Sequence, residues 1–471
     1  MRVIEVRNPR NGKLDYALRP LEGYDLKEEV ARLRKGQLRW QSSPLEHRIE
    51  VMQRWAESFS NHKEAVLESL ILDTGRKSES ILEVNLMSQT ILRWCQLVKS
   101  IFKNQDDKTS NIPSIYIKQQ VQPYPLVGVI SPWNFPLLLA CIDTIPAILA
   151  GCSVLVKPSE ITPRFLEPLM ASIREIPELA DVLSFVPGDG ITGSEMIPMV
   201  DLLCFTGSVS TGKSIYMACA RNFIPCFLEL GGKDPALVFE GANLEHAASS
   251  ILWGSIVNNG QSCLSIERVY VQKNIETAFL DILKRKMEKV KIAYPNMEDG
   301  QIGPIIAEKQ VSIIQEQLDD ALAKGAKIIS GWSACEHLGG GWFIKPTLLT
   351  GVNHQMKIMQ EESFGPLIPV MSFDSEEGAI SLANETQFGL SAAIFHQNWE
   401  KAYRIGMQIE AGAISINECA LTALVHEGEK QAFKMSGIGG TRMGPAAIRR
   451  FLRQKAFLIN KSENPSPWWF P

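Results

Sequence analysis

One of the nine cysteines has surroundings that suit covalent chemistry. Cys263 closes the run G-Q-S-C at 260–263, so glycine and polar residues flank it, and we expect it to lie on a turn after a helix. A cysteine becomes a nucleophile when nearby dipoles or positive charge stabilise its thiolate. The other eight cysteines are interpreted as small buried hydrophobes. Cys263 is therefore the candidate nucleophile of this chain.

Two further residues could act on a species bound to such a thiol. Glu229 opens the run E-L-G-G-K at 229–233, at the end of a predicted strand, where a buried carboxylate could activate water or could instead form an ion pair or a helix cap. Asn134 lies in the run S-P-W-N-F-P at 131–136. Its amide could donate to a developing oxyanion, or the residue could simply occupy a turn or a helix N-cap.

Two loops could hold a nucleotide. The run F-T-G-S-V-S-T-G at 205–212 joins a predicted strand to a predicted helix, where glycines admit a ligand and the free amides of the helix favour a phosphate. Its spacing is not G-x-G-x-x-G, so the usual dinucleotide fingerprint is absent. The run K-P-S-E at 157–160 follows another strand, and its lysine and glutamate could bind ribose hydroxyls or simply be solvated. Together on one sheet, the two loops favour a dinucleotide site more than either does alone.

The elements that would position these residues alternate between apolar runs and helical patterns. The first series of predicted strands covers 126–130, 153–156, 182–186, 202–205 and 224–230. A second series covers a strand at 235–239, a helix at 244–257, a strand at 269–272, and mixed segments at 301–330 and 367–384. This alternation predicts doubly wound, mostly parallel α/β units.

Other segments predict the surroundings of these units. Residues 26–100 have helical periodicity after a short strand at 3–6, and residues 114–121 alternate as a strand that should pair with a distant segment. The most apolar stretch, 136–156, contains Asp143 and is interpreted as a buried helix and a buried strand rather than a membrane span.

The composition limits the class of protein. The 471 residues exceed the ~300 at which one hydrophobic core usually stops growing, and 45% hydrophobic with 21% charged residues is typical of globular proteins. Lys and Arg number 48 against 52 Asp and Glu, which argues against nucleic-acid binding. The unpaired cysteine spacing and the lack of an apolar leader predict a cytoplasmic protein with neither disulfides nor a metal site.

Seven motifs, taken in order, resemble the aldehyde dehydrogenase superfamily over essentially the whole chain. They are P-W-N-F-P at 132–136, K-P-S-E at 157–160, F-T-G-S-x-x-x-G at 205–212, E-L-G-G-K at 229–233, G-Q-S-C at 260–263, E-E-S-F-G-P at 361–366 and K-M-S-G at 434–437. The glutamate and cysteine motifs are the most specific of the seven.

The resemblance implies an α/β fold with two Rossmann-like doubly wound domains and a small β oligomerisation flap. The dinucleotide-binding domain would comprise 1–105 and 124–231, the catalytic domain 232–435, and the flap with the C-terminal tail 106–123 and 436–471. Strands at 114–121 and 454–460 would add to a partner's sheet, giving a homodimer or a homotetramer.

The resemblance also implies oxidation of an aldehyde to a carboxylic acid. Cys263 would attack the aldehyde carbon to give a thiohemiacetal, whose oxyanion is held by the Asn134 side chain and the Cys263 amide. Hydride would leave for a nicotinamide, and water activated by Glu229 would hydrolyse the resulting thioester. Relatives that transfer the acyl group to coenzyme A generally lack this glutamate, so hydrolysis is favoured.

The implied cofactor is NAD, with NADP as an alternative. Lys157 and Glu160 match positions that hold the adenine-side ribose, Ser208 a pyrophosphate contact, Glu362 the nicotinamide ribose, and Phe364 a place beside the ring. The full implied cofactor set is Ser131, Trp133, Lys157, Ser159, Glu160, Gly207, Ser208, Gly231, Glu362 and Phe364. The negative charge of Glu160 should repel the 2′-phosphate of NADP.

The substrate is a small-molecule aldehyde of unassigned structure. An apolar tunnel wall of Phe135, Leu139 and Ile142 suggests hydrophobic aldehydes. The usual glycine pair before K-x-S-G is replaced by Gln431-Ala432, and G-G-T-R at 439–442 replaces G-R-E, which affects the substrate mouth. The Trp468–Phe470 tail could cover that mouth. We expect the arginines 449, 450 and 453 to lie on a solvated face.

Three alternatives remain at this point. The chain could be a relative that forms or reduces an acyl-coenzyme A, which Glu229 argues against. It could be a catalytically silent protein with the same fold, although Cys263, Glu229 and Asn134 are all present. It could be a cysteine hydrolase without a redox step, although no histidine lies in a recognisable partner segment.

Overall fold

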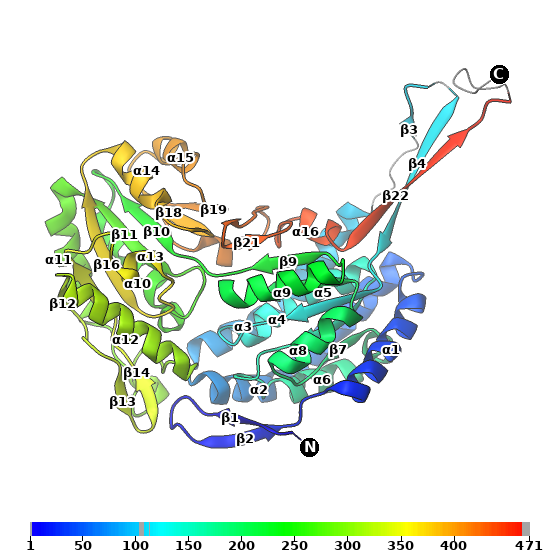
Figure 1. Ribbon diagram of the computed structural model, residues 1–471, viewed down its shortest axis with the longest axis horizontal. Helices are drawn as coiled ribbons and strands as arrows, with labels where there is room; N and C mark the ends of the chain where they lie inside the picture. Colours follow the sequence, from blue (N-terminus) through cyan, green and yellow to red (C-terminus); the bar gives the residue numbers. More distant parts are fainter. Residues whose placement is uncertain (1, 103–107, 113, 464–471) are drawn as a thin grey trace.

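Two parallel β-sheets with their helices form the two halves of the molecule, and a thin antiparallel arm projects from one of them (Figure 1). This computed structural model describes residues 2–102, 108–112 and 114–463. The Trp468–Phe470 segment named above lies outside the described residues. The predicted fold class, two doubly wound α/β units with a small β extension, is confirmed.

The first sheet has the strand order β21-β9-β8-β5-β6-β7. Its parallel strands are β5 (Leu126–Ile130), β6 (Ser153–Lys157), β7 (Leu183–Phe185), β8 (Leu202–Thr206) and β9 (Cys226–Glu229). All five were predicted to within two residues, because strands covered on both faces read as continuous apolar runs. The chain leaves β5 for β6 and β7 on one side and returns to β8 and β9 on the other. The carboxyl ends of β5 and β8 therefore flank a crevice of the kind that holds ligands in such sheets.

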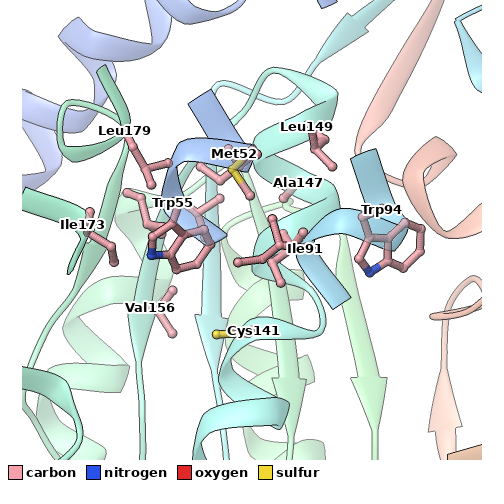
Figure 2. Packing of buried hydrophobic residues seen from close by; sticks show 14 of the residues in the cluster. Met52, Trp55, Ile91, Trp94, Cys141, Ala147, Leu149, Val156, Ile173 and Leu179 are labelled. Atoms are coloured by element: carbon pink, nitrogen blue, oxygen red, sulfur yellow. The ribbon is translucent and has the colours of Figure 1, made fainter. Parts of the chain in front are cut away.

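Alternate residues of these strands pack on opposite faces of the sheet. Val154 and Val156 belong to the core formed with the second and third helices, whereas Leu155 packs with Leu26 and Leu33 of the first helix. Figure 2 shows Trp55, which is completely buried, within the larger core.

Helices and one short hairpin surround the first sheet. The N-terminal elements are β1 (Ile4–Arg7), β2 (Leu14–Leu18), α1 (Gly23–Trp40), α2 (Leu45–Thr74) and α3 (Ser78–Ile101). The first strand and the three helices were predicted, and β2 was not. The connecting helices are α4 (Pro136–Cys141), α5 (Thr144–Ala150), α6 (Leu166–Arg174), α7 (Pro177–Ala180), α8 (Gly190–Met196) and α9 (Val209–Arg221).

The second sheet has the order β12-β15-β16-β11-β10-β18-β19, and every strand except the edge strand β12 is parallel to its neighbours. Its strands are β10 (Asp234–Val238), β11 (Ile266–Gln272), β12 (Lys327–Ser330), β15 (Thr347–Thr350), β16 (Leu367–Phe373), β18 (Ser391–Phe395) and β19 (Ala413–Ile416). The accompanying elements are α10 (Leu244–Ile256), α11 (Glu276–Met287), α12 (Glu308–Ala323), β13 (Glu336–Leu338), β14 (Gly341–Phe343), α13 (Lys357–Gln360), α14 (Glu376–Asn384) and α15 (Trp399–Gly406).

The projecting arm joins two segments that lie far apart in the sequence. Strand β4 (Ile115–Pro123) pairs antiparallel with β22 (Leu452–Asn460), which confirms the expected distant partner. The two-residue strand β3 (Lys108–Thr109) also pairs with β4, a local hairpin that the sequence analysis did not predict because β3 is too short to show a pattern.

A bridge of two short strands connects the halves near the ends of both sheets. Strand β20 (Phe433–Lys434) pairs with β17 (Phe388–Gly389), and β21 (Gly437–Ile438) pairs antiparallel with β9. Gly437 lies opposite Glu229 in this register. Strand β21, which falls inside the 436–471 segment assigned above to the flap and tail, is thus an edge strand of the first sheet.

The interpretation of 136–156 as a buried helical stretch followed by a buried strand is confirmed, whereas the expectation for Arg450 was wrong. The apolar stretch after residue 136 forms two short helices, and the fully buried Asp143 between them accepts hydrogen bonds from Arg442 and from Arg450. Arg450, expected on a solvated face, has a side chain that is 5% exposed, because it pairs with this carboxylate. The spacing of arginines along one helix cannot reveal an anionic partner 307 residues away. Within the described residues, the longest helices carry too many polar residues for any to cross a bilayer.

Candidate active site

Cys263 lies on a turn between α10 and β11, as predicted. The preceding turn Val257–Gly260 contains Asn258 and Asn259 at φ +54°, a left-handed conformation that asparagine tolerates better than most residues. Gly260 has φ +71°, and a Cβ atom there would collide with the backbone of Gly365. This tight turn therefore brings Cys263 beside the E-E-S-F-G-P segment.

The E-L-G-G-K segment crosses from the first half to the second directly against Cys263. A Cβ atom on Gly232 would collide with the carbonyl oxygen of Cys263, and one on Gly231 would collide with the carboxylate of Glu362. Glycine is required at position 232 because the clash there is with backbone, whereas a side chain at position 231 would displace the Glu362 carboxylate. Glu229, at the end of β9, precedes these glycines, and its charge and that of Glu362 both act on Cys263.

The surroundings of the Cys263 thiol disfavour its ionisation. Burial, the largest cause, raises the pKa of Cys263 to about 12. The positive charge of Lys430 acts in the opposite direction, whereas the carboxylates of Glu362, Glu229 and Asp234 raise the pKa further.

Asn134 is buried and lies against the turn that carries the cysteine. Its Nδ2 atom donates to the carbonyl of Gln261 at 3.0 Å, two residues before Cys263. An amide nitrogen has two N–H donors, and this contact uses one of them. The Asn134 carbonyl accepts from Arg76 at 2.7 Å and from Asn258 at 2.9 Å, which fixes its backbone.

A buried ion pair holds the backbone at Asn134, because Arg76 binds both the Asn134 carbonyl and Glu83. Arg76 and Glu83 are 2.9 Å apart with side chains 5% and 0% exposed. The other Glu83 oxygen accepts from the amides of Leu137 and Leu138 at the start of α4. Burial raises the pKa of Glu83 to about 7, although Arg76 opposes the shift. The guanidinium also lies 4.6 Å from the ring centre of Phe135.

A cavity of 540 Å³ occupies the crevice at the carboxyl ends of the first sheet. Seven of the ten predicted cofactor residues line it: Ser131, Trp133, Lys157, Ser159, Glu160, Gly207 and Ser208. The Ser131 hydroxyl is buried and has no hydrogen-bond partner among the described residues, so it is available to a ligand. Ser208 caps α9 by accepting from the Thr211 amide, and the other amides of this helix N-terminus suit a phosphate.

Lys157 and Glu160 stand together at one end of this cavity. Their charged groups are 3.6 Å apart, and the lysine also donates to the Gly188 carbonyl at 3.3 Å. Burial lowers the pKa of Lys157, partly offset by Glu160. These polar groups, the capped helix and the free hydroxyl fit a dinucleotide.

The other three predicted cofactor residues, Gly231, Glu362 and Phe364, lie at the junction rather than in this cavity. The Glu362 carboxyl accepts from the Gly232 amide at 3.0 Å, and burial together with the charge of Glu267 raises its pKa to about 8. The Phe364 ring meets the Trp133 ring edge-on, with centroids 5.3 Å apart. This contact joins the cavity to the cysteine turn.

The predicted tunnel wall follows one face of α4. Phe135, Leu139 and Ile142 are partly exposed, whereas Leu137 and Ala140 on the opposite face belong to the core. The spacing of four and three residues places the exposed side chains on one side of the helix.

The sequence analysis missed the charged residues that support the site. Besides Arg76 and Glu83, buried Lys233 binds Glu267 at 2.7 Å, and Glu267 accepts from the amides of Ser363 and Phe364. Lys233 ends the E-L-G-G-K motif, which was the one available signal. Lys430, 3.0 Å from Glu229, gave no signal because its partner lies 201 residues away. The described residues contain no cluster of three His, Cys, Asp or Glu side chains that could hold a metal ion.

Comparison with known proteins identifies the family of the chain. The model of the aldehyde dehydrogenase family matches residues 1–457. The solved structure of a putative aldehyde dehydrogenase, PutA, from Anabaena variabilis is 52% identical with a TM-score of 0.97, and the match covers all of both chains. A betaine aldehyde dehydrogenase from Staphylococcus aureus, solved with NAD+, is 29% identical with a TM-score of 0.93 over 100% of this chain and 96% of the other. A 4,4'-diapolycopene aldehyde oxidase from Methylomonas sp is 33% identical over 95% of this chain and 84% of its own length.

The chain therefore belongs to the aldehyde dehydrogenase family. It is an oxidoreductase of the NAD(P)-dependent aldehyde dehydrogenase class, which confirms the predicted enzyme class.

Proposed function

We propose that this enzyme oxidises an aldehyde to the free carboxylic acid through an acyl group held on Cys263. The observation that carries the proposal is the junction itself, where the crossing glycines lie against Cys263 and Glu362, and the charge of Glu229 acts on Cys263, beside the nucleotide cavity. A thiol, a carboxylate and an adjoining dinucleotide cleft supply a nucleophile, a base and a place for a hydride acceptor.

In the first stage the Cys263 sulfur bonds to the aldehyde carbon and its proton leaves, which gives a thiohemiacetal. The second N–H of Asn134 and the backbone amide of Cys263 stabilise the oxyanion, a contribution of about 3 kcal/mol where such donors have been removed from other enzymes. NAD, when bound, accepts the hydride. The product of this stage is a thioester on Cys263.

In the second stage Glu229 removes a proton from water, which attacks the thioester carbon. The carbon–sulfur bond breaks, and the thiol and the carboxylic acid are released. Glu229 is the residue that favours hydrolysis over transfer of the acyl group to coenzyme A. The alternatives to this proposal are an enzyme that forms acyl-coenzyme A and a catalytically silent protein with the same fold.

The cavity residues support NAD as the preferred dinucleotide. Lys157 and Glu160 would bind the adenine-side ribose, the Ser208 cap the pyrophosphate, and Glu362 the nicotinamide ribose. The S. aureus relative was solved with NAD+, which agrees with this preference. The Glu160 carboxylate would disfavour the 2′-phosphate of NADP.

The surroundings of the junction support an apolar aldehyde. Phe135, Leu139 and Ile142 would form one wall of the substrate tunnel.

We also propose a cytoplasmic location and a homodimer or homotetramer in which the β4–β22 arm extends a partner's sheet, since Phe457 and Leu458 on this arm are exposed.

The test is NADH formation by the purified enzyme, measured by absorbance with NAD or NADP and a panel of aliphatic, aromatic and semialdehyde substrates. Wild type should turn over, Cys263→Ala should not, and Glu229→Gln should give a single burst. If no aldehyde gives a signal with either dinucleotide, the proposed activity is contradicted. If kcat/KM is higher on succinic semialdehyde than on hexanal and benzaldehyde, the proposed substrate class is contradicted.

A further inference from the structure

A lysine from the bridge between the halves enters the catalytic junction. Lys430 precedes β20, and its backbone amide donates to the Thr441 hydroxyl at 3.0 Å. Its Nζ atom donates to Glu229 Oε1 at 3.0 Å. The Lys430 side chain is 8% exposed and that of Glu229 16%, so solvent screens this pair far less than a surface pair.

More negative than positive groups act on Cys263. Three carboxyl groups face it: Glu229 from the end of β9, Asp234 from β10 and Glu362 from the segment after α13. Lys430 is the cation that acts against them. Its charge also reaches Asp234, and Arg442, which is paired with Asp143, faces Glu229 from another direction.

The segment that carries this lysine is firmly anchored. Lys430 comes immediately before Gln431-Ala432 and β20. After β20, the Ser436 carbonyl accepts from the Leu230 amide at 2.8 Å, and the Ser436 hydroxyl accepts from the Gly389 amide at 2.9 Å.

We propose that Lys430 is a positioning residue, which holds the Glu229 carboxylate at the end of β9 and supplies the positive charge that favours the Cys263 thiolate. The proposal rests on the proposed function, in which Cys263 and Glu229 act on the same acyl group. Without Lys430, the Glu229 carboxylate would lose its ion-pair partner and oppose the ionisation of the sulfur more strongly.

The experiment measures how fast iodoacetamide alkylates Cys263 between pH 7 and pH 10, with the Cys263 peptide quantified by mass spectrometry. Alkylation follows the thiolate fraction, so Lys430→Met should react about tenfold more slowly than wild type at each pH below the Cys263 pKa. Lys430→Arg keeps the charge and should react within about twofold of wild type. Glu229→Gln removes a negative charge and should react faster than wild type.

Lys434→Met is the matched control, because Lys434 lies in the same loop and pairs with Glu410 at 2.6 Å instead of with Glu229. It should react as wild type does. If Lys430→Met does not fold, as judged by circular dichroism, Lys430→Gln is the second neutral variant and should show the same slowing.

Equal rates for wild type and the folded neutral variant would overturn the proposal, as would a Lys430→Arg variant as slow as the neutral one. Because this measurement needs neither aldehyde nor NAD, it decides the role of Lys430 even if the enzyme oxidises no aldehyde in the activity panel.

Discussion

The nucleotide cavity and the catalytic junction are built in different ways. The cavity is formed by loops that follow successive strands of one sheet, and each of its predicted residues lies within a few positions of a strand end. The junction gathers side chains from both halves and from the bridge, including Asn134, Glu229, Cys263, Glu362 and Lys430. Local sequence therefore determines the cavity, whereas tertiary contacts between charged residues determine the junction.

The largest effect should come from the buried pair beneath the junction. Arg76→Met leaves Glu83 buried without its cation and should lower the free energy of unfolding by about 3–5 kcal/mol in a denaturant titration. Arg54→Met is the control, because the Arg54–Glu178 pair is about 40% exposed on both sides and should contribute less than about 1 kcal/mol. If both variants lose the same free energy of unfolding, the buried pair at the junction contributes no more than a surface pair, which contradicts the prediction.

The oxyanion role of Asn134 predicts the next effect. Asn134→Ala should lower kcat by about 10²–10³-fold because one donor to the developing oxyanion is lost. NAD affinity, measured by fluorescence titration, should change little, since Asn134 does not line the cavity. A fall in kcat of less than about threefold, with the thermal midpoint unchanged, would assign the residue to the turn alone.

The raised pKa of Glu362 at the junction predicts that the stability of the protein depends on pH. This pKa is raised in the folded state to about 8 from an unfolded value near 4.5, so ionisation costs stability progressively as pH rises through this window. Glu362→Gln, which cannot ionise, should therefore be the more stable protein at pH 9, and its advantage should shrink as the pH falls until the two proteins match near pH 4. Urea titrations of both proteins across this range measure the difference, and parallel curves would contradict the buried, protonated carboxyl.

Glu160 predicts the smallest effect and concerns the cavity alone. Its side chain is 39% exposed, so solvent weakens its charge. Glu160→Gln should raise the ratio of kcat/KM for NADP to that for NAD by about fivefold. Glu167→Gln, a surface glutamate paired with Arg174, should leave the ratio unchanged. An unaltered ratio in Glu160→Gln would place the origin of dinucleotide preference elsewhere in the cavity.

The same contrast explains what the sequence could predict. The strands of the first sheet, the turn at Cys263 and the helix cap at Ser208 follow from apolar runs, glycines and capping residues that lie next to one another. Asp143 and Arg450 were interpreted separately, as an interruption of an apolar stretch and as a solvated residue, because no local pattern joins a carboxylate to a cation 307 residues away. The sequence analysis did not identify Lys430 for the same reason, since its partner Glu229 is 201 residues away.

The most direct test of the central claim is the mass of the Glu229→Gln variant after mixing with aldehyde and NAD and rapid acid quenching. We expect the peptide that contains Cys263 to gain the mass of the aldehyde less two hydrogens, because one acyl group replaces the thiol hydrogen, and we expect no such gain in Cys263→Ala. An acyl group on another residue, or an NADH burst with no acyl group on any peptide, would contradict the covalent route through Cys263 and the role of Glu229 in its hydrolysis.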